Sequence, residues 1–268
     1  MRGAVLGAAL CLLSVLRVGP ALAAGEKPDI EIKTHAAEIT VTIEDKLKSD
    51  PALRADLLAE GHRFADKARA DAETEYKADR AWFKDHKWSY DRTYSLRSEV
   101  AGRYVSIVRD DGTYGGGAHP NSRADTILWD RAQKKRISIR PFFKETADNG
   151  PTLTALAKTV RLAVAVEKAD RSQNDSKDPA EKLVEDDPQL KEAVQPKLLK
   201  IGPISLAPST VAGKSAGLTF HFSAYDVDGY AAGPYTIFVP WTELKLFLSP
   251  EGAAIFGGDR PASDKEQL

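Results

Sequence analysis

Alternating apolar and polar residues predict strands in both halves of the chain. Within residues 30–43, apolar side chains recur at every second position from Ile39 to Ile43, which is typical of a strand with one buried face. The clearest alternation covers residues 218–222, and we expect His221, on the polar face of that strand, to be solvated. The same reasoning predicts further strands at residues 88–96, 103–108, 126–129, 136–140 and 235–239.

Apolar residues at helical spacing predict a long helix and a second, shorter one. The long helix begins at Asp50 and Pro51, because aspartate is a good N-cap and proline suits the first helical position. Its apolar stripe continues to Phe83. The second helix is expected near residues 152–166, with shorter helical stretches at 181–185 and 241–248. Because helices and hairpins occur in separate blocks, we predict an α+β fold in which antiparallel sheets pack against these two main helices.

The chain begins with the pattern of a secretory signal peptide. Arg2 supplies a positive charge, residues 4–18 are almost wholly apolar, and Ala21 and Ala23 form a small-x-small cleavage pattern. The apolar run is shorter than the roughly 20 residues that a membrane helix needs. We therefore expect cleavage near Ala23 rather than an uncleaved anchor, a periplasmic or secreted mature chain, and no transmembrane segment within it.

Composition narrows the chemistry that the mature chain can use. Cys11 is the only cysteine and lies inside the predicted signal peptide, so we expect no disulfide and no cysteine metal ligand. The chain has 38 Lys and Arg against 39 Asp and Glu, a net charge of −1 at pH 7, with both signs interleaved. This balance argues against a nucleic-acid partner. Phosphate- and dinucleotide-binding glycine patterns are incomplete, and we expect no cofactor.

The motifs associated with catalysis fail in their context. Residues 213–217 match G-x-S-x-G, but a nucleophile elbow needs a strand before the serine and a helix after it. A strand follows here, so we predict a hairpin turn. Residues 226–229 break the calcium-loop pattern and also predict a turn. The histidines lack the spacing of a metal-binding helix. We therefore expect no metal site and assign no catalytic residue.

The glycine-rich segment that ends in His119 and Asn121 allows two interpretations. Three successive glycines permit backbone conformations and close approaches that side chains forbid, so this loop could pin a tight crossing between two strands. Alternatively it is an exposed binding loop, since ligand contacts concentrate on loops held by a rigid scaffold. The candidate binding residues on this second interpretation are Tyr114, Gly116, Gly117, His119, Asn121, Tyr225 and Tyr230.

Several of these motifs together resemble a bacterial envelope family. They are the GGxAH loop before Asn121, the hairpin around Ile137–Ile139, the strand Leu218–Phe222, and the Tyr230–Pro234 segment. In this order they are similar to the domain pair DUF4163 and DUF3298 of lysozyme-sensing anti-sigma factors and of a peptidoglycan deacetylase. The resemblance implies a DUF4163-like region over 24–130 and a DUF3298-like region over 131–256. The signal peptide predicted from its own pattern covers 1–23, and the polar composition of 257–268 predicts a disordered tail.

The resemblance implies a binding module. The sequence shows no counterpart of the anti-sigma transmembrane helix or of the deacetylase catalytic domain, so we expect an exported cell-envelope protein without catalysis. Its partner is expected to be a protein such as lysozyme, or alternatively a cell-wall glycan. A rival hypothesis is a peptidoglycan hydrolase that uses His119 as general base beside Asp226 or Asp228. A purely structural envelope protein is the third.

Overall fold

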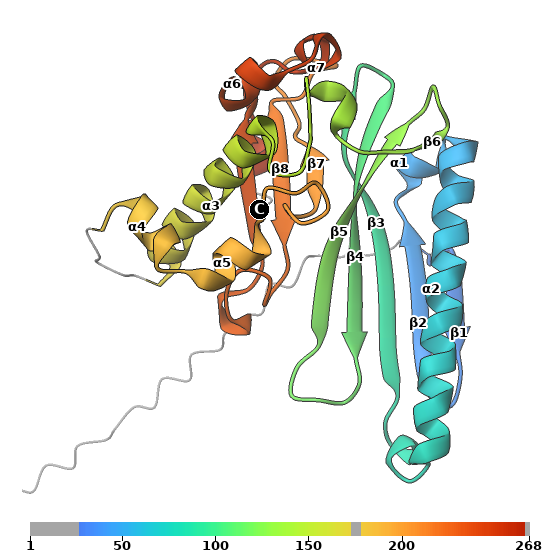
Figure 1. The fold of residues 1–268 in the computed structure, drawn as a ribbon. Helices are drawn as coiled ribbons and strands as arrows, with labels where there is room; N and C mark the ends of the chain where they lie inside the picture. The colour runs from blue at the N-terminus through green and yellow to red at the C-terminus, as the bar shows by residue number, and fades with distance from the viewer. Residues whose placement is uncertain (1–26, 173–177, 266–268) are drawn as a thin grey trace, which may run out of the picture.

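The computed structural model describes residues 27–172 and 178–265, which fold as four layers in the order helix, sheet, sheet, helix (Figure 1). The long helix α2 covers the outer face of a six-stranded sheet, and α3 covers the outer face of a three-stranded sheet. The predicted α+β class is confirmed. The predicted signal peptide, its cleavage site near Ala23, and residues 266–268 lie outside the described residues. Within the described ranges, no helix combines the length and apolarity needed to cross a membrane.

The six-stranded sheet follows the order of the chain. Its strands are β1 (Ile30–Lys33), β2 (Ala37–Ile43), β3 (Trp88–Val100), β4 (Tyr104–Tyr114), β5 (Asn121–Asp130) and β6 (Lys135–Ile137). All neighbouring pairs are antiparallel except β2 and β3, which run parallel. The expectation of purely antiparallel sheets is therefore wrong at this pair. The reason is the connection, because a helix between two strands returns the chain to the end where the first strand began.

The connection is made by the short helix α1 (Asp45–Lys48) and by α2 (Pro51–Ala78), followed by the single turn η1 (Trp82–Lys84). The predicted N-cap is confirmed: the Asp50 carboxylate accepts hydrogen bonds from the backbone N–H groups of Ala52 and Leu53 at 3.0 and 3.1 Å. Gly61 lies where the helix crosses β2. A Cβ there would lie 2.9 Å from Val41, so glycine permits this close approach.

The second sheet has the order β7 (Ile204–Leu206), β8 (Gly217–Phe222) and β9 (Tyr235–Pro240). The apolar face of β8 and the apolar side of α3 (Pro151–Arg171) belong to one hydrophobic cluster. The remaining elements are η2 (Arg140–Phe142), α4 (Ala180–Glu185), α5 (Pro188–Ala193), η3 (Tyr230–Ala232), α6 (Trp241–Leu244), η4 (Lys245–Phe247), α7 (Pro250–Ile255) and α8 (Ala262–Lys265).

The two sheets meet through hydroxyl groups. Ser98 Oγ donates to the carbonyl of Leu206 at 2.6 Å, and the N–H of Leu206 donates to Ser106 Oγ at 2.9 Å. The N–H of Ile204 donates to Thr126 Oγ1 at 2.9 Å. These three hydroxyls come from β3, β4 and β5, so the short strand β7 is fastened across the inner face of the larger sheet.

The same inner layer buries His221, so the prediction that it is solvated is wrong. Only 7% of His221 is exposed, and its Nε2 lies 2.8 Å from the Oγ of buried Ser205. The alternation along β8 is real, but its polar face meets the larger sheet in place of water. Burial, together with the positive charge of Arg97, lowers the pKa of His221 to about 4.

The predicted disordered tail is ordered over residues 257–265. Asp264 is 3% exposed, and its carboxylate accepts hydrogen bonds from Arg97 of β3 at 2.8 Å and from Arg260 at 2.6 Å. Burial alone would raise the pKa of Asp264, but its bonds to these two guanidinium groups lower it. The disorder prediction is wrong for these residues, because one carboxylate held between two cations anchors a segment whose composition is polar.

Candidate functional site

The glycine-rich loop is shorter than the sequence suggests, because β4 continues to Tyr114 and the loop covers only residues 115–120. Gly116 has a φ of +81°, and a Cβ there would lie 2.2 Å from the ring of Trp82. A Cβ on Gly115 would lie 3.4 Å from the ring of Trp88. Packing onto these rings explains the glycine at 116 in structural terms. No sequence spacing connects Trp82 to this loop, so its contact with Gly116 could not be predicted from the sequence.

On its other side the loop joins an aromatic patch, which we define as His119, Tyr225 and Tyr230. The rings of His119 and Tyr230 are stacked, with centroids 3.7 Å apart and planes at 20°. Tyr225 and Tyr230 follow at 5.4 Å. The Tyr230 hydroxyl donates to the carbonyl of Pro120 at 2.9 Å, which ties the loop to the segment between β8 and β9. Tyr225 is 57% exposed, so the patch presents aromatic surface to solvent.

The other candidate binding residues do not join this patch. Tyr114 ends β4 and pairs with Ser89 of β3. Gly116 faces Trp82, while Gly117 has open space around its Cα. Asn121 is the exposed first residue of β5. The structure thus brings together three of the seven candidate binding residues, and their binding role stays a prediction.

The acid–base pair of the hydrolase hypothesis is not assembled. His119 Nδ1 lies 3.1 Å from the carbonyl oxygen of Pro120. Asp226 accepts a hydrogen bond from the N–H of Ser223 at 2.7 Å, and Asp228 accepts one from the Tyr235 hydroxyl at 2.7 Å. Both carboxylates therefore hold other partners. A general base must come within hydrogen-bond reach of the group that it serves, and this arrangement lends the hypothesis no support.

The serine residues near histidine or glycine motifs have structural roles. Ser215 of the G-x-S-x-G string is fully buried, and its Oγ lies 3.0 and 2.7 Å from the carbonyl oxygens of Ala207 and Gly217. Ser205 and His221 form a close pair, but both are buried between the sheets. A base with a pKa of about 4 is also poorly matched to neutral pH. Among the described residues, no three His, Cys, Asp or Glu side chains are placed to hold a metal ion.

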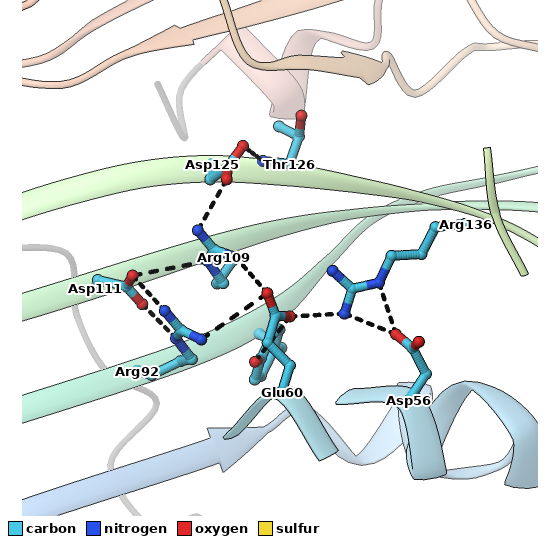
Figure 2. Close-up of polar contacts among 9 residues, drawn as sticks. Asp56, Glu60, Arg92, Arg109, Asp111, Asp125, Thr126 and Arg136 are labelled. Carbon is cyan, nitrogen blue, oxygen red and sulfur yellow. Dashed lines mark hydrogen bonds and ion pairs between the residues drawn. The ribbon is translucent and has the colours of Figure 1, made fainter. Parts of the chain in front are cut away.

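A network of charged side chains joins α2 to the larger sheet, and Figure 2 shows Glu60 at its centre. Glu60 accepts hydrogen bonds from Arg109 of β4 at 2.6 Å and from Arg136 of β6 at 2.7 Å. Burial would raise the pKa of Glu60, but the bond from Arg136 and the charges of the surrounding arginines lower it. Arg109 also donates to Asp125 of β5 at 2.8 Å. The network clamps the helix to the sheet and ends at the carboxylate of Asp125 on β5.

Asp125 also lines a cleft of about 520 Å³ that opens beside β5. This volume lies in the range of small-ligand sites, roughly 300–1,000 Å³. One wall is the middle of β5, from Arg123 to Leu128, with residues 137–139, and the other is made by residues between 198 and 204. Asp226, next to Tyr225 of the aromatic patch, also lines the cleft, so the two features adjoin. The sequence carries no periodic signal for this cleft, because its walls come from separate segments.

A comparison with protein families finds a match within the second half of the chain. The model of the family described as "Protein of unknown function (DUF3298)" matches residues 142–242. Residues 142–242, which we call the DUF3298 region, are therefore similar to this family. The predicted DUF3298 resemblance is thereby confirmed, whereas the DUF4163-like assignment of residues 24–130 stays a prediction. The DUF3298 region supplies Tyr225 and Tyr230 of the patch and the 198–204 wall of the cleft, while the preceding residues supply His119 and β5.

Two solved DUF3298 structures are similar to this chain. A member of the family from Bacteroides fragilis NCTC 9343 is 15% identical, with a TM-score of 0.49, over 82% of this chain and 92% of that one. A DUF3298 family protein from Pseudomonas aeruginosa PAO1 is 19% identical, with a TM-score of 0.46, over 83% of this chain and 87% of that one. No curated protein matches the chain.

Proposed function

We propose that this chain is an exported, non-catalytic binding protein of the bacterial envelope, and that its aromatic patch binds a protein partner of the lysozyme class. The observation that carries the proposal is the aromatic patch, in which His119 and Tyr230 stack half-buried and Tyr225 is exposed beside them. Tyrosine rings supply a large and rigid contact area at low entropic cost, and such residues often dominate the energy of an interface. Export rests on the predicted signal peptide, and the lysozyme class rests on the family resemblance.

The way the patch is held supports a binding role. Its residues come from two loops more than 100 positions apart, joined by the bond between Tyr230 and the Pro120 carbonyl. Tyr225 has a φ of +74°, a strained backbone conformation for a residue other than glycine. Such strain persists where the surrounding structure enforces it, and it occurs often at ligand-binding sites. The loops therefore present a preorganised surface, which lowers the entropy lost on binding.

Isothermal titration calorimetry with egg-white lysozyme tests the proposal on the chain from residue 24 to 268. We expect saturable binding, and we expect Tyr225→Ala to weaken it at least about ten-fold, as for a central interface aromatic. Leu246→Ala is the control, because Leu246 is 81% exposed and lies in η4, outside the patch. Its affinity should equal that of the unmodified chain.

Each alternative has its own outcome in the same set of measurements. Absence of heat with lysozyme at high micromolar concentration would refute a partner of this class. Binding of soluble peptidoglycan fragments that Tyr225→Ala abolishes would assign the patch to a glycan. Release of muropeptides by the unmodified chain but not by His119→Ala would establish the hydrolase hypothesis and overturn the proposal.

A further inference from the structure

β5 keeps an open edge beside the cleft. It pairs with β4 along Asn121–Asp130, but β6 covers only Leu128–Asp130 on its other side. Over residues 121–127, the described part of the chain therefore places no second strand against β5. Two N–H groups at this edge are occupied by side chains: Ala124 donates to Ser223 Oγ at 2.9 Å, and Thr126 donates to the carboxylate of Asp125 at 2.7 Å.

Two carbonyl groups at the same edge, those of Ala124 and Thr126, are available to a ligand as far as the described residues show. In an antiparallel strand, the N–H and C=O of one residue point to the same side. Because the N–H groups of Ala124 and Thr126 bond away from β4, their carbonyls also face the open edge. No donor in the described residues bonds either oxygen. Residues two apart in a strand are separated by about 6.8 Å, which matches the spacing of donors along an extended peptide.

The cleft beside this edge combines an apolar lining with unpaired positive charge. Its apolar residues are Leu128, Ile137, Ile139, Ala193, Leu198, Leu199, Pro203, Ile204 and Phe222. Its two acids are engaged, since Asp125 pairs with Arg109 and Asp226 accepts from the N–H of Ser223. Its two cations, Arg123 and Lys200, form no ion pair or side-chain hydrogen bond with any described residue. The bond from Ser223 leaves the charge of Asp226 in place, so with Asp125 compensated by Arg109 the lining has two cations against one carboxylate, a net charge of +1 among the described residues.

We propose that this cleft binds an extended acidic peptide, which adds to the open edge of β5 as a further strand. The carbonyls of Ala124 and Thr126 accept hydrogen bonds from its backbone, apolar side chains enter the cleft, and its carboxylates meet Arg123 and Lys200. In strand addition the main-chain bonds supply affinity and the side-chain contacts supply specificity. This site adjoins the aromatic patch but is lined by none of its three residues, and it does not depend on the function proposed for the patch.

Fluorescence anisotropy of labelled pentapeptides tests this site on the chain from residue 24 to 268. The probe is Val-Glu-Val-Glu-Val with a free carboxyl terminus, compared with Val-Lys-Val-Lys-Val and with the acidic peptide N-methylated at alternate amides. We expect the acidic peptide to bind with a Kd below about 1 mM at low salt, as for a weak specific contact. We expect the lysine peptide and the N-methylated peptide each to bind at least about ten-fold more weakly, since one lacks complementary charge and the other lacks donors.

Two double variants locate the site. Arg123→Ala with Lys200→Ala should weaken binding of the acidic peptide at least about ten-fold. Lys77→Ala with Lys245→Ala removes the same charge from exposed positions on α2 and η4 and should leave the affinity unchanged. Circular dichroism should show both proteins folded. The proposal is overturned if the acidic peptide does not bind at 1 mM, if the lysine or N-methylated peptide binds equally well, or if both double variants bind alike.

The lysozyme titration separates this proposal from the preceding one. The Arg123→Ala and Lys200→Ala protein should bind lysozyme as the unmodified chain does, while Tyr225→Ala should bind the acidic peptide normally. Loss of both ligands in either variant would show one shared site and would overturn the assignment of a separate peptide cleft.

Discussion

His221 makes the stability of this protein depend on pH in a way that the structure predicts. The imidazole is buried between the two sheets, and its Nε2 lies 2.8 Å from Ser205 Oγ. Burial and the charge of Arg97 lower its pKa from 6.5 to about 4. Protonation would leave a buried cation beside a guanidinium group, so the folded protein resists it. In the unfolded chain this burial is absent, so His221 is protonated at its ordinary pKa of 6.5.

The sign and magnitude follow from proton linkage. Between pH 6.5 and pH 4 the unfolded chain binds a proton at His221 that the folded chain does not. The free energy of unfolding is therefore highest above pH 6.5 and falls as the pH is lowered through this window. Because one pKa unit corresponds to about 1.4 kcal/mol, lowering the pH through the whole window reduces the free energy of unfolding by about 3 kcal/mol. About 2 kcal/mol of it is lost between pH 7 and pH 5.

Urea unfolding at pH 7, 6 and 5, followed by tryptophan fluorescence, measures this loss. His221→Gln keeps a polar side chain and removes the titration, so the stability of the variant should fall by about 2 kcal/mol less than that of the unmodified chain between pH 7 and pH 5. His62→Gln is the matched control, because His62 is exposed on α2. Parallel pH profiles for the unmodified chain and His221→Gln would show that His221 does not cause the loss of stability.

Two further predictions concern the helix clamp and the glycine-rich loop. Glu60→Gln leaves Arg109 and Arg136 without their shared anion, and should lower the free energy of unfolding in urea by about 2–4 kcal/mol. The control is Glu75→Gln, an exposed change on the same helix. An equal loss of stability in the two variants would contradict the prediction. Gly116→Ala must adopt a φ of +81° against Trp82 and should cost about 1–2 kcal/mol with a shift in tryptophan emission. Gly117→Ala, which meets open space, should change neither quantity.

Elements that depend on neighbouring residues were predictable from the sequence. Asp50 and Pro51 mark the start of α2 because capping is a contact between residues two and three positions apart. The apolar stripe of α3 was likewise visible at helical spacing. The end of β4 could not be predicted in this way. Asp110–Gly112 has the composition of a turn, yet pairing with β3 and β5 keeps it extended.

The candidate site depends on contacts that no local pattern contains. The glycine-rich segment drew attention to His119, but its stacking on Tyr230 joins residues far apart in the chain. The packing of Gly116 on Trp82 is equally remote. No sequence pattern predicts the cleft, because Arg123 and Lys200 resemble ordinary surface cations in the sequence. Only the fold brings their segments together.

The alternation along β8 shows what sequence determines and what it leaves to tertiary structure. Leu218, Phe220 and Phe222 specify a strand with one apolar face, and that face does pack with α3 in the core. The opposite face carries Thr219 and His221, both buried. A two-residue period shows that the two faces of the strand differ in polarity. It does not show whether the polar face contacts water or another layer of hydrogen-bonding groups. The packing of the second sheet against the hydroxyl groups of the first determines that the polar face is buried. Polar side chains between the two sheets form hydrogen bonds with protein groups instead of water.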